Sequence, residues 1–129
     1  MDFPRNLKYA KTHEWARREE SKVVVGISEY AQKELADVVF VELPRLKTQV
    51  KQGQACAVVE SVKAAFDIYA PVSGEIIGVN RKLATDPSLI NRNPYGEGWF
   101  FEIRTSDASE MDRLLDAETY GATVHEGAS

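Results

Sequence analysis

The sequence has few of the residues on which a self-contained enzyme depends. It holds one cysteine, Cys56, and two histidines, His13 and His125, which lie far apart in the chain. A hydrolase needs a nucleophile with a base in reach, and a structural zinc site needs about four ligands. A glycine-rich phosphate loop is also lacking, because Gly74 and Gly78 frame a strand-like segment. We therefore expect neither catalysis by this chain alone nor a bound metal.

Basic runs and long apolar runs are lacking as well. The 16 Lys and Arg residues stand against 20 Asp and Glu, a net charge of −4, which argues against a nucleic-acid surface. No apolar run approaches the roughly 20 residues that span a bilayer, and the start Met1–Pro4 is not a signal peptide. Cys56 cannot form an internal disulfide, which is compatible with a reducing compartment. We expect a soluble monomer of the bacterial cytoplasm, or of the mitochondrial matrix if a eukaryotic chain has been processed.

The fold class follows from many short apolar segments separated by turns. A length of 129 residues with 43% hydrophobic residues suits one domain, residues 1–129, with its core between about 8 and 120. Residues after about 125 are expected to fray. The pattern predicts a mainly β domain, a sandwich or flattened barrel with short helices at its margins.

Strand-like composition predicts the following order of elements. The first strand is Lys8–Ala16, with Tyr9, His13 and Trp15 alternating, and it ends in the charged turn Arg17–Glu20. Further strands are expected at 22–27, 38–43, about Val50, 54–59, 65–69, 74–79 and 99–103.

Three helix starts are predicted from capping residues. Ser28 caps a short helix with Ala31 and Leu35 on its apolar face. Asp86 and Pro87 have the order of a cap and a first helical residue, with Leu89 and Ile90 turned inward. Ser109 begins a helical tail containing Met111, Leu114 and Leu115, and Gly121 ends it.

One lysine stands in a short polar break between two strand-like segments. The break Glu60–Ala64 joins the segments 54–59 and 65–69, and it predicts a hairpin with Lys63 at its outward tip. Spacing alone leaves two readings open: an ordinary solvated turn lysine, or a lysine with a special use.

The chain also resembles a known family over nearly its whole length. The resemblance lies in six groups of segments, in this order: Thr12–Trp15; Val25–Ile27 with Tyr30–Gln32; Val39–Pro44; Val58–Ala64; Ala70–Glu75; and Asn93–Trp99. They are similar to the H-protein family of the glycine cleavage system.

This resemblance implies that Lys63 is joined through an amide to lipoic acid, on an arm that reaches roughly 14 Å when extended. Glu60, Ser61, Val62 and Ala64 would form the hairpin that the lipoate-attaching enzyme recognises. It further implies a carrier whose chemistry belongs to its partners: glycine decarboxylase (P protein), which uses pyridoxal phosphate, aminomethyltransferase (T protein) and dihydrolipoyl dehydrogenase (L protein).

By motif position, the family's protective cleft for the aminomethyl-loaded arm is expected at Thr12, Glu14 and Asp67. A carboxylate there can pair with the cationic amine. Tyr95, Gly98 and Trp99 are expected to fix the loop that closes this cleft, and packing in the core is an equal alternative for Trp99.

The sequence departs from the family at three positions. Phe66 stands where a small polar residue is common, and Ala36 and Lys47 stand where glycine is common. Phe66 makes the hairpin surface more apolar, and the two others leave the turn geometry open.

Two other carriers and one relay role compete with this interpretation. A biotinyl domain is disfavoured because Val62 and Ala64, rather than methionines, flank Lys63. The lipoyl domains of 2-oxo acid dehydrogenases are shorter and lack the first and last of the six groups. A relay protein that donates lipoyl groups to other proteins would keep the same lysine motif, and it stays the alternative.

Overall fold

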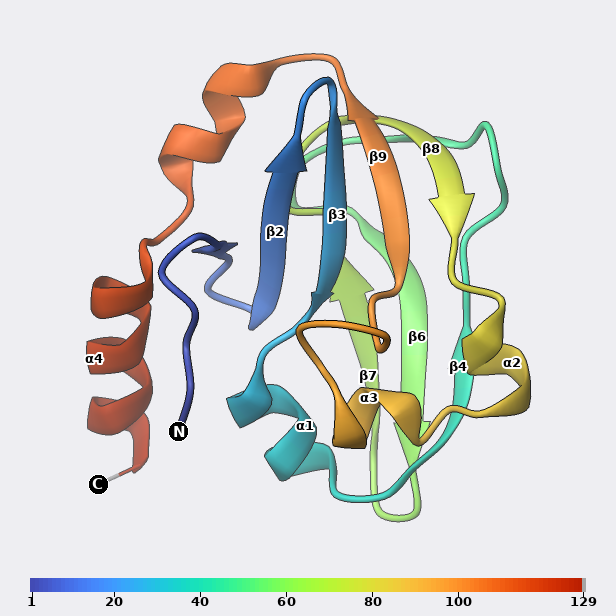
Figure 1. Cartoon of the computed structure of the whole chain (residues 1–129), viewed down its shortest axis with the longest axis vertical. Helices are drawn as coiled ribbons and strands as arrows, with labels where there is room; N and C mark the ends of the chain where they lie inside the picture. The colour runs from blue at the N-terminus through green and yellow to red at the C-terminus, as the bar shows by residue number, and fades with distance from the viewer. Residues whose placement is uncertain (129) are drawn as a thin grey trace.

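Two open antiparallel sheets make up most of the fold (Figure 1). The computed structural model describes residues 1–128, and the side chains of residues 1–124. The larger sheet has the order β1 (Lys8–Tyr9), β2 (Glu14–Glu19), β3 (Lys22–Ile27), β9 (Phe101–Thr105), β8 (Gly74–Val79), β5 (Gln49–Val50). The smaller sheet has the order β4 (Val38–Glu42), β6 (Ala55–Ser61), β7 (Ala65–Tyr69). The expected mainly β class is confirmed, as a sandwich-like arrangement rather than a closed barrel.

Short helices lie around the sheets and one longer helix covers an outer face. They are α1 (Glu29–Leu35), α2 (Lys82–Thr85), α3 (Leu89–Arg92), a 3₁₀ helix (Ala108–Arg113) and α4 (Ala117–Ala128). Figure 1 shows α4 beside the N-terminal segment, on the β2 side of the larger sheet.

The main core lies between the two sheets. Val23 and Val25 of β3, Val59 of β6 and Ile103 of β9 are fully buried in it. Val24 points to the opposite face of β3, where Trp15 and Tyr120 of α4 bury it in a second cluster. Because both faces of β3 are covered, its sequence is a continuous apolar run instead of an alternating one.

The first predicted strand was wrong, because two strands lie within it. β1 ends at Tyr9, the chain turns back, and β2 begins at Glu14, so that Tyr9 pairs with Trp15. His13 occupies this turn with φ 83°. The apparent alternation therefore runs across a tight turn. The charged stretch after Ala16 is likewise strand: β2 continues to Glu19, and the turn comes at Glu20, with φ 59°.

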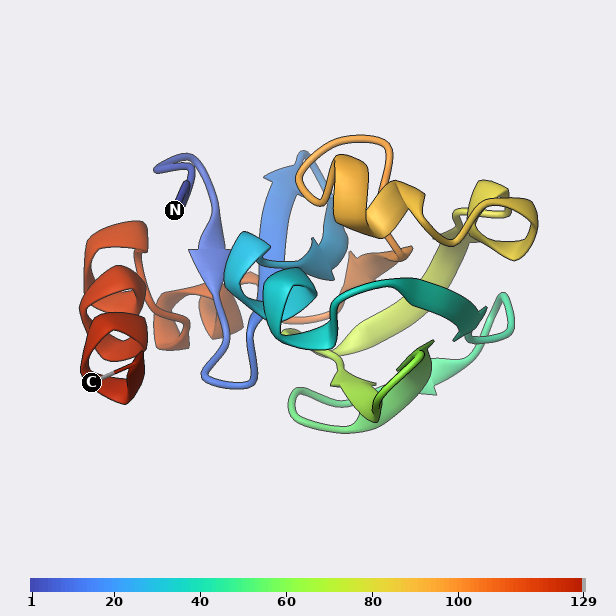
Figure 2. The ribbon, with the colours of Figure 1, turned by 90° about the horizontal axis from the view of Figure 1, so that it is seen from below.

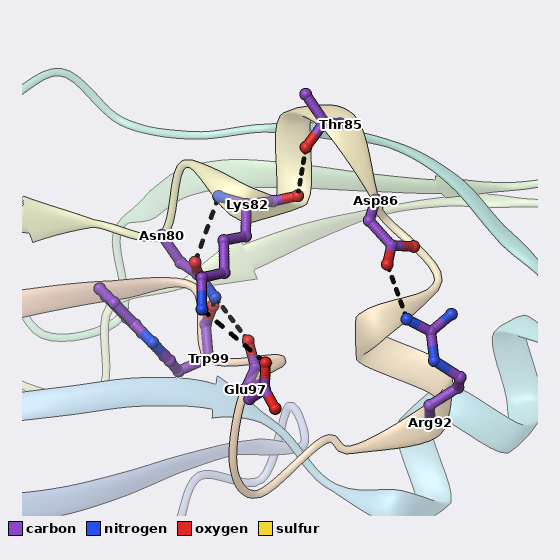
Figure 3. A network of polar contacts seen from close by, with 7 residues as sticks. All are labelled: Asn80, Lys82, Thr85, Asp86, Arg92, Glu97 and Trp99. Carbon is purple, nitrogen blue, oxygen red and sulfur yellow. Dashed lines mark hydrogen bonds and ion pairs between the residues drawn. The ribbon is translucent and has the colours of Figure 1, made fainter.

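The helix predictions were partly correct. The Ser28 hydroxyl caps α1 by accepting a hydrogen bond from the Ala31 N–H at 3.2 Å, and Leu35 is buried. Asp86 does not begin a helix; it ends α2, and its carboxylate contacts Arg92 at 2.6 Å (Figure 3). The first residue of α3 is Leu89.

The C-terminal predictions also needed correction. Ala108–Arg113 is a 3₁₀ helix capped by Asp107, and Leu115 pairs with Tyr9 as an isolated bridge. Gly121 lies inside α4, whose backbone runs to Ala128, so it does not end a helix. Fraying was predicted after about residue 125, and the side chains of those residues lie outside the described part of the chain.

The remaining strand predictions agree with the structure to within two residues at most ends. They are the segments at 22–27, 38–43, about Val50, the two hairpin arms and 74–79, matched by β3, β4, β5, β6, β7 and β8. The last strand, β9, begins at Phe101, two residues later than expected.

Candidate functional site: a lysine hairpin beside an acid-lined cleft

Lys63 lies at the centre of the turn between β6 and β7, and it is exposed. The Ser61 N–H donates to the Ala64 carbonyl at 2.8 Å and closes this turn. The Ser61 hydroxyl accepts from the N–H groups of Lys63 at 3.3 Å and Ala64 at 3.1 Å. A serine at this position thus satisfies the backbone of a short turn, which leaves the lysine side chain free.

The hairpin turn is tied to the end of α1. The Val62 N–H donates to the Asp37 carbonyl at 3.2 Å, two residues after Leu35 ends α1. Both views show the turn beside this end of the helix (Figure 1, Figure 2). Glu60 and Val62 are exposed, Val62 by 71%. Lys63 therefore lies on a turn that is hydrogen-bonded to the segment that follows α1, and a partner can reach its exposed neighbours.

A cleft of about 530 Å³ opens between α1, the turn before β2, and the free edge of β7. Its walls combine apolar and polar side chains: Lys11, Thr12, His13, Ile27, Tyr30, Ala31, Glu34, Leu35, Val59, Phe66, Asp67, Ile68 and Tyr69. Small-molecule sites have volumes of roughly 300–1,000 Å³. The cleft is thus large enough for a short acyl chain with a polar end.

Glu14 lies behind the cleft wall and does not line it. It is 0% exposed. The Thr12 hydroxyl donates to one of its carboxyl oxygens, and the Tyr69 N–H donates to the other at 3.0 Å. Burial raises the pKa of Glu14, while the hydrogen bonds from Thr12 and Tyr69 oppose that rise. Glu14 therefore joins β2 to β7 and orients Thr12, which itself faces the cleft.

Asp67 and Phe66 line the cleft from β7. Both are exposed, Phe66 by 50%, although Phe66 pairs with the buried Val59 on β6. Phe66 thus stands at the cleft and not inside the core. Three residues were expected at the cleft. Thr12 and Asp67 line it, whereas Glu14 is buried behind its wall.

The sequence interpretation missed Glu34 and Tyr30, which line the cleft from α1. A signal was available: Glu34 follows Ala31 by three residues and Tyr30 by four, so it borders the predicted apolar face of that helix. Interaction with Glu34 is the main cause that raises the pKa of Tyr30.

His13 is held by aromatic neighbours. Its Nδ1 lies 2.7 Å from the Tyr120 hydroxyl, and its ring centroid is 5.0 Å from that of Tyr30. Burial lowers the pKa of His13, and the charge of Glu34 opposes this in part. The neutral ring therefore connects the cleft wall to α4.

The thiol of Cys56 is unreactive in this setting. Burial, and next the charge of Glu14, raise the pKa of Cys56 to about 12. A neutral thiol at ordinary pH is a weak nucleophile. Cys56 is partly buried and packs against the main core.

The loop Asn93–Trp99 does not line the cleft, contrary to expectation. The buried Asn80 side chain donates to the carbonyls of Glu97 at 2.6 Å and Trp99 at 2.8 Å (Figure 3). The Tyr95 hydroxyl accepts from the Glu29 N–H at 2.9 Å. This loop therefore fixes the start of α1, and through it one wall of the cleft.

The two unusual positions outside the hairpin adopt backbone conformations that favour glycine. Ala36 has φ 62° and ψ −140°, and Lys47 has φ 70°. Glycine enters such regions without a Cβ clash. The backbone at both positions therefore has a conformation that favours glycine, although neither residue is glycine.

A solved structure shares this fold over nearly the whole chain. The crystal structure of a glycine cleavage system H protein from Mycobacterium marinum superposes with a TM-score of 0.89 at 35% identity. The match covers 95% of this chain and 99% of that one. The fold is thus the fold of a known H protein.

The sequence comparisons give the family. The model of the family "Glycine cleavage H-protein" matches residues 7–127. Relatives named glycine cleavage system H protein from Shewanella loihica and Shewanella baltica are 58% and 56% identical over 126 residues, 97% of this chain and 98% of each relative. The chain belongs to the glycine cleavage H-protein family.

No helix among residues 1–128 has the length and apolar character needed to cross a membrane.

Proposed function

We propose that this protein carries lipoate on Lys63 and transports the aminomethyl group in glycine cleavage. One observation carries the proposal: in a chain of this family, an exposed lysine on an anchored turn lies beside a cleft of about 530 Å³. Asp67 follows Lys63 by four residues, which span at most about 13 Å of extended chain, so an arm of roughly 14 Å reaches the cleft wall.

The hairpin's contribution is accessibility. Lipoate would supply a disulfide that accepts the aminomethyl group and is reduced as it does so. Ser61 keeps the turn closed from the backbone side, while the short Ala64 side chain leaves space around the lysine. Glu60, Ser61, Val62 and Ala64 would then be recognised by the lipoate-attaching enzyme as an exposed turn.

The cleft's contribution is protection of the loaded arm. Ile27, Leu35 and Val59 supply apolar walls that exclude water. Thr12 and Asp67 supply polar groups for the amine. Glu14, with both oxygens engaged, would act through Thr12 by fixing its hydroxyl.

The chain itself would supply positioning and no catalysis. The P, T and L proteins would act on the arm in turn, each by transient contact with a monomeric carrier. We place this cycle in the bacterial cytoplasm, where the glutathione and thioredoxin systems keep thiols reduced.

Intact mass and reconstitution test this function together. Expression with lipoate and an attaching enzyme should add one lipoyl group, and the product should support glycine decarboxylation with P, T and L proteins. A biotinyl mass would favour the other carrier class. A lipoylated chain that supports no turnover with cognate partners, but passes its lipoyl group to another protein, would favour the relay role.

A further inference from the structure

A second cavity, of about 240 Å³, adjoins the cleft and lies at the end of β7 away from Lys63. Figure 1 shows β7 running away from the hairpin turn, and Tyr69 at its far end lines the cavity. The other walls are the end of β1 with the turn after it, the loop before β6, and the end of the 3₁₀ helix with the residues that follow. Segments that are distant in the sequence therefore meet around this cavity.

Hydrogen bonds fix these walls to one another. The Leu115 N–H donates to the Tyr9 carbonyl at 2.8 Å and joins β1 to the segment after the 3₁₀ helix. The Gln52 side chain donates to the carbonyls of Pro71 at 3.0 Å and Glu110 at 3.2 Å, so the loop before β6 is joined to two other walls. The cavity is thus formed before any ligand enters, as is usual for small-molecule sites.

The lining carries positive charge alone. Lys11 and Arg113 line the cavity, and no carboxylate does so among the described residues. Neither takes part in an ion pair among residues 1–124. Arg113 helps to lower the pKa of Asp107, but the Asp107 carboxylate is engaged by the Ser109 N–H at 3.0 Å and the Ser109 hydroxyl at 2.6 Å. In a chain with 20 acids and 16 Lys and Arg, this is a local excess of positive charge.

Most of the remaining lining is apolar. Tyr9 and Ala70 are 0% and 1% exposed, Pro71 is buried, and Leu115 is half-buried. Lysine and arginine form charge-assisted hydrogen bonds with carboxylates, and a guanidinium can bind both oxygens at once. The apolar walls suit a short hydrocarbon chain. The volume is below the roughly 300–1,000 Å³ of sites for drug-sized ligands, so the ligand that fits is small.

We propose that this cavity binds a small organic carboxylate with a short apolar chain, and that Lys11 and Arg113 hold its carboxylate group. The site lies apart from Lys63 and goes beyond the proposed carrier function, on which it does not depend.

The test is a titration of the ¹⁵N-labelled full-length chain with sodium butyrate at constant ionic strength, followed by its amide resonances. The resonances of Thr12, Gly53 and Leu115, which line the cavity, should shift and saturate with a dissociation constant on the order of 1–10 mM. The Val62 resonance, in the turn at the other end of β7, should not move. The lipoylated chain should give the same result, because Lys63 does not line the cavity. Shifts that do not saturate would overturn the site.

Two variants remove one cation each. Lys11→Gln and Arg113→Gln should each weaken butyrate binding about threefold or more, because each removes a charge-assisted hydrogen bond. Lys51→Gln is the matched control, since it removes the same charge from an exposed residue beside Gln52 that does not line the cavity. It should bind butyrate as the wild type does. Unchanged affinity in both cavity variants, whose amide spectra also report that they are folded, overturns the inference.

Three further ligands test the chemical class. 1-Butanol has the chain without the charge, and its shifts should not saturate in the same range. Acetate, which lacks most of the chain, should bind about fivefold or more weakly than butyrate. Tighter binding of inorganic phosphate than of butyrate would contradict a site for carboxylates with an apolar chain.

Failure of the carrier function looks different. A chain that binds butyrate but takes up no lipoate would contradict the proposed function and leave the cavity site intact. A lipoylated chain that accepts the aminomethyl group, yet does not bind butyrate, would overturn the cavity site alone.

Discussion

The two sheets differ in what they expose to solvent. The smaller sheet and its turn present Val39, Phe40, Val62 and Phe66, each at least half exposed. In the larger sheet, β3 buries apolar side chains on both of its faces, and β9 buries its apolar side chains in the main core. The smaller sheet thus presents the lysine and its surroundings, and the larger sheet supports them. Changes to the first should alter modification and cargo, whereas changes to the second should alter stability.

The largest expected effect is on the smaller sheet. Lys63→Arg keeps the charge but removes the primary amine, so lipoylation should be lost completely. Because Lys63 is exposed at the turn, the free energy of unfolding should stay within about 0.5 kcal/mol of wild type. Intact mass and urea unfolding measure the two quantities. Lys51→Arg, also exposed, is the matched control and should be lipoylated normally.

The opposite result is expected on the larger sheet. A Cβ on Gly26 would lie 2.5 Å from the Trp15 ring, which is buried and cannot move aside. Gly26→Ala should therefore cost about 2 kcal/mol in urea unfolding, while molecules that remain folded should still be lipoylated on Lys63.

Gly121→Ala serves as the control for this change. Its added Cβ would meet the Phe3 ring at 3.3 Å in the interior of α4, where alanine favours the helix. Equal destabilisation by both substitutions would show that the close approach of Trp15 to Gly26 is not the cause.

Glu14 connects the two sheets, and its pH dependence sharpens the comparison. Because burial raises the pKa of Glu14, the folded chain holds this proton more tightly than the unfolded chain does. The associated stability is fully present below the unfolded pKa, near 4.5, and it is lost as the pH rises through the folded pKa.

Glu14→Gln cannot ionise and keeps an acceptor for the Tyr69 N–H. As the pH rises across this interval, the free energy of unfolding of Glu14→Gln should increase relative to that of wild type. Urea unfolding at several pH values measures the difference. Parallel curves for the two proteins would mean that burial does not control this carboxyl group.

The smallest expected effect lies where α1 leads into the smaller sheet. Ala36, with φ 62° and ψ −140°, occupies a region that is strained for residues with a Cβ. Ala36→Gly should stabilise the chain by about 0.5–1 kcal/mol. Ala31→Gly, inside α1, should instead cost about 1 kcal/mol. Thermal unfolding separates the two, and a loss of stability in both would contradict the strain at Ala36.

Much of the fold could be predicted from local patterns, and the exceptions have physical causes. β-branched runs predicted β3, β4 and β8, and Ser28 predicted the start of α1. The split between β1 and β2 was missed because Tyr9, His13 and Trp15 keep an alternating pattern across a turn whose left-handed residue is a histidine and not a glycine. The 3₁₀ helix was missed because its spacing differs little from that of an α-helix over one turn.

The candidate site was predictable where sequence neighbours decide it. The break around Lys63 located the hairpin turn, because its flanking strands pair with each other. The depth of Glu14 could not be predicted, since it depends on the Tyr69 N–H, 55 residues away. The contact between the hairpin turn and the residues after α1 is equally non-local, because it joins the Val62 N–H to the Asp37 carbonyl.

The central claim is that a lipoyl arm on Lys63 receives the aminomethyl group of glycine. The most direct measurement is the mass of the lipoylated chain, with peptide mapping, after incubation with glycine and its cognate glycine decarboxylase. The account predicts the added mass of methylamine on the lipoyl arm at Lys63, because one sulfur gains the aminomethyl group and the other gains a hydrogen, and it predicts no such mass in Lys63→Arg. A lipoylated chain that gains no such mass, while the same decarboxylase loads a Shewanella loihica relative, would contradict it.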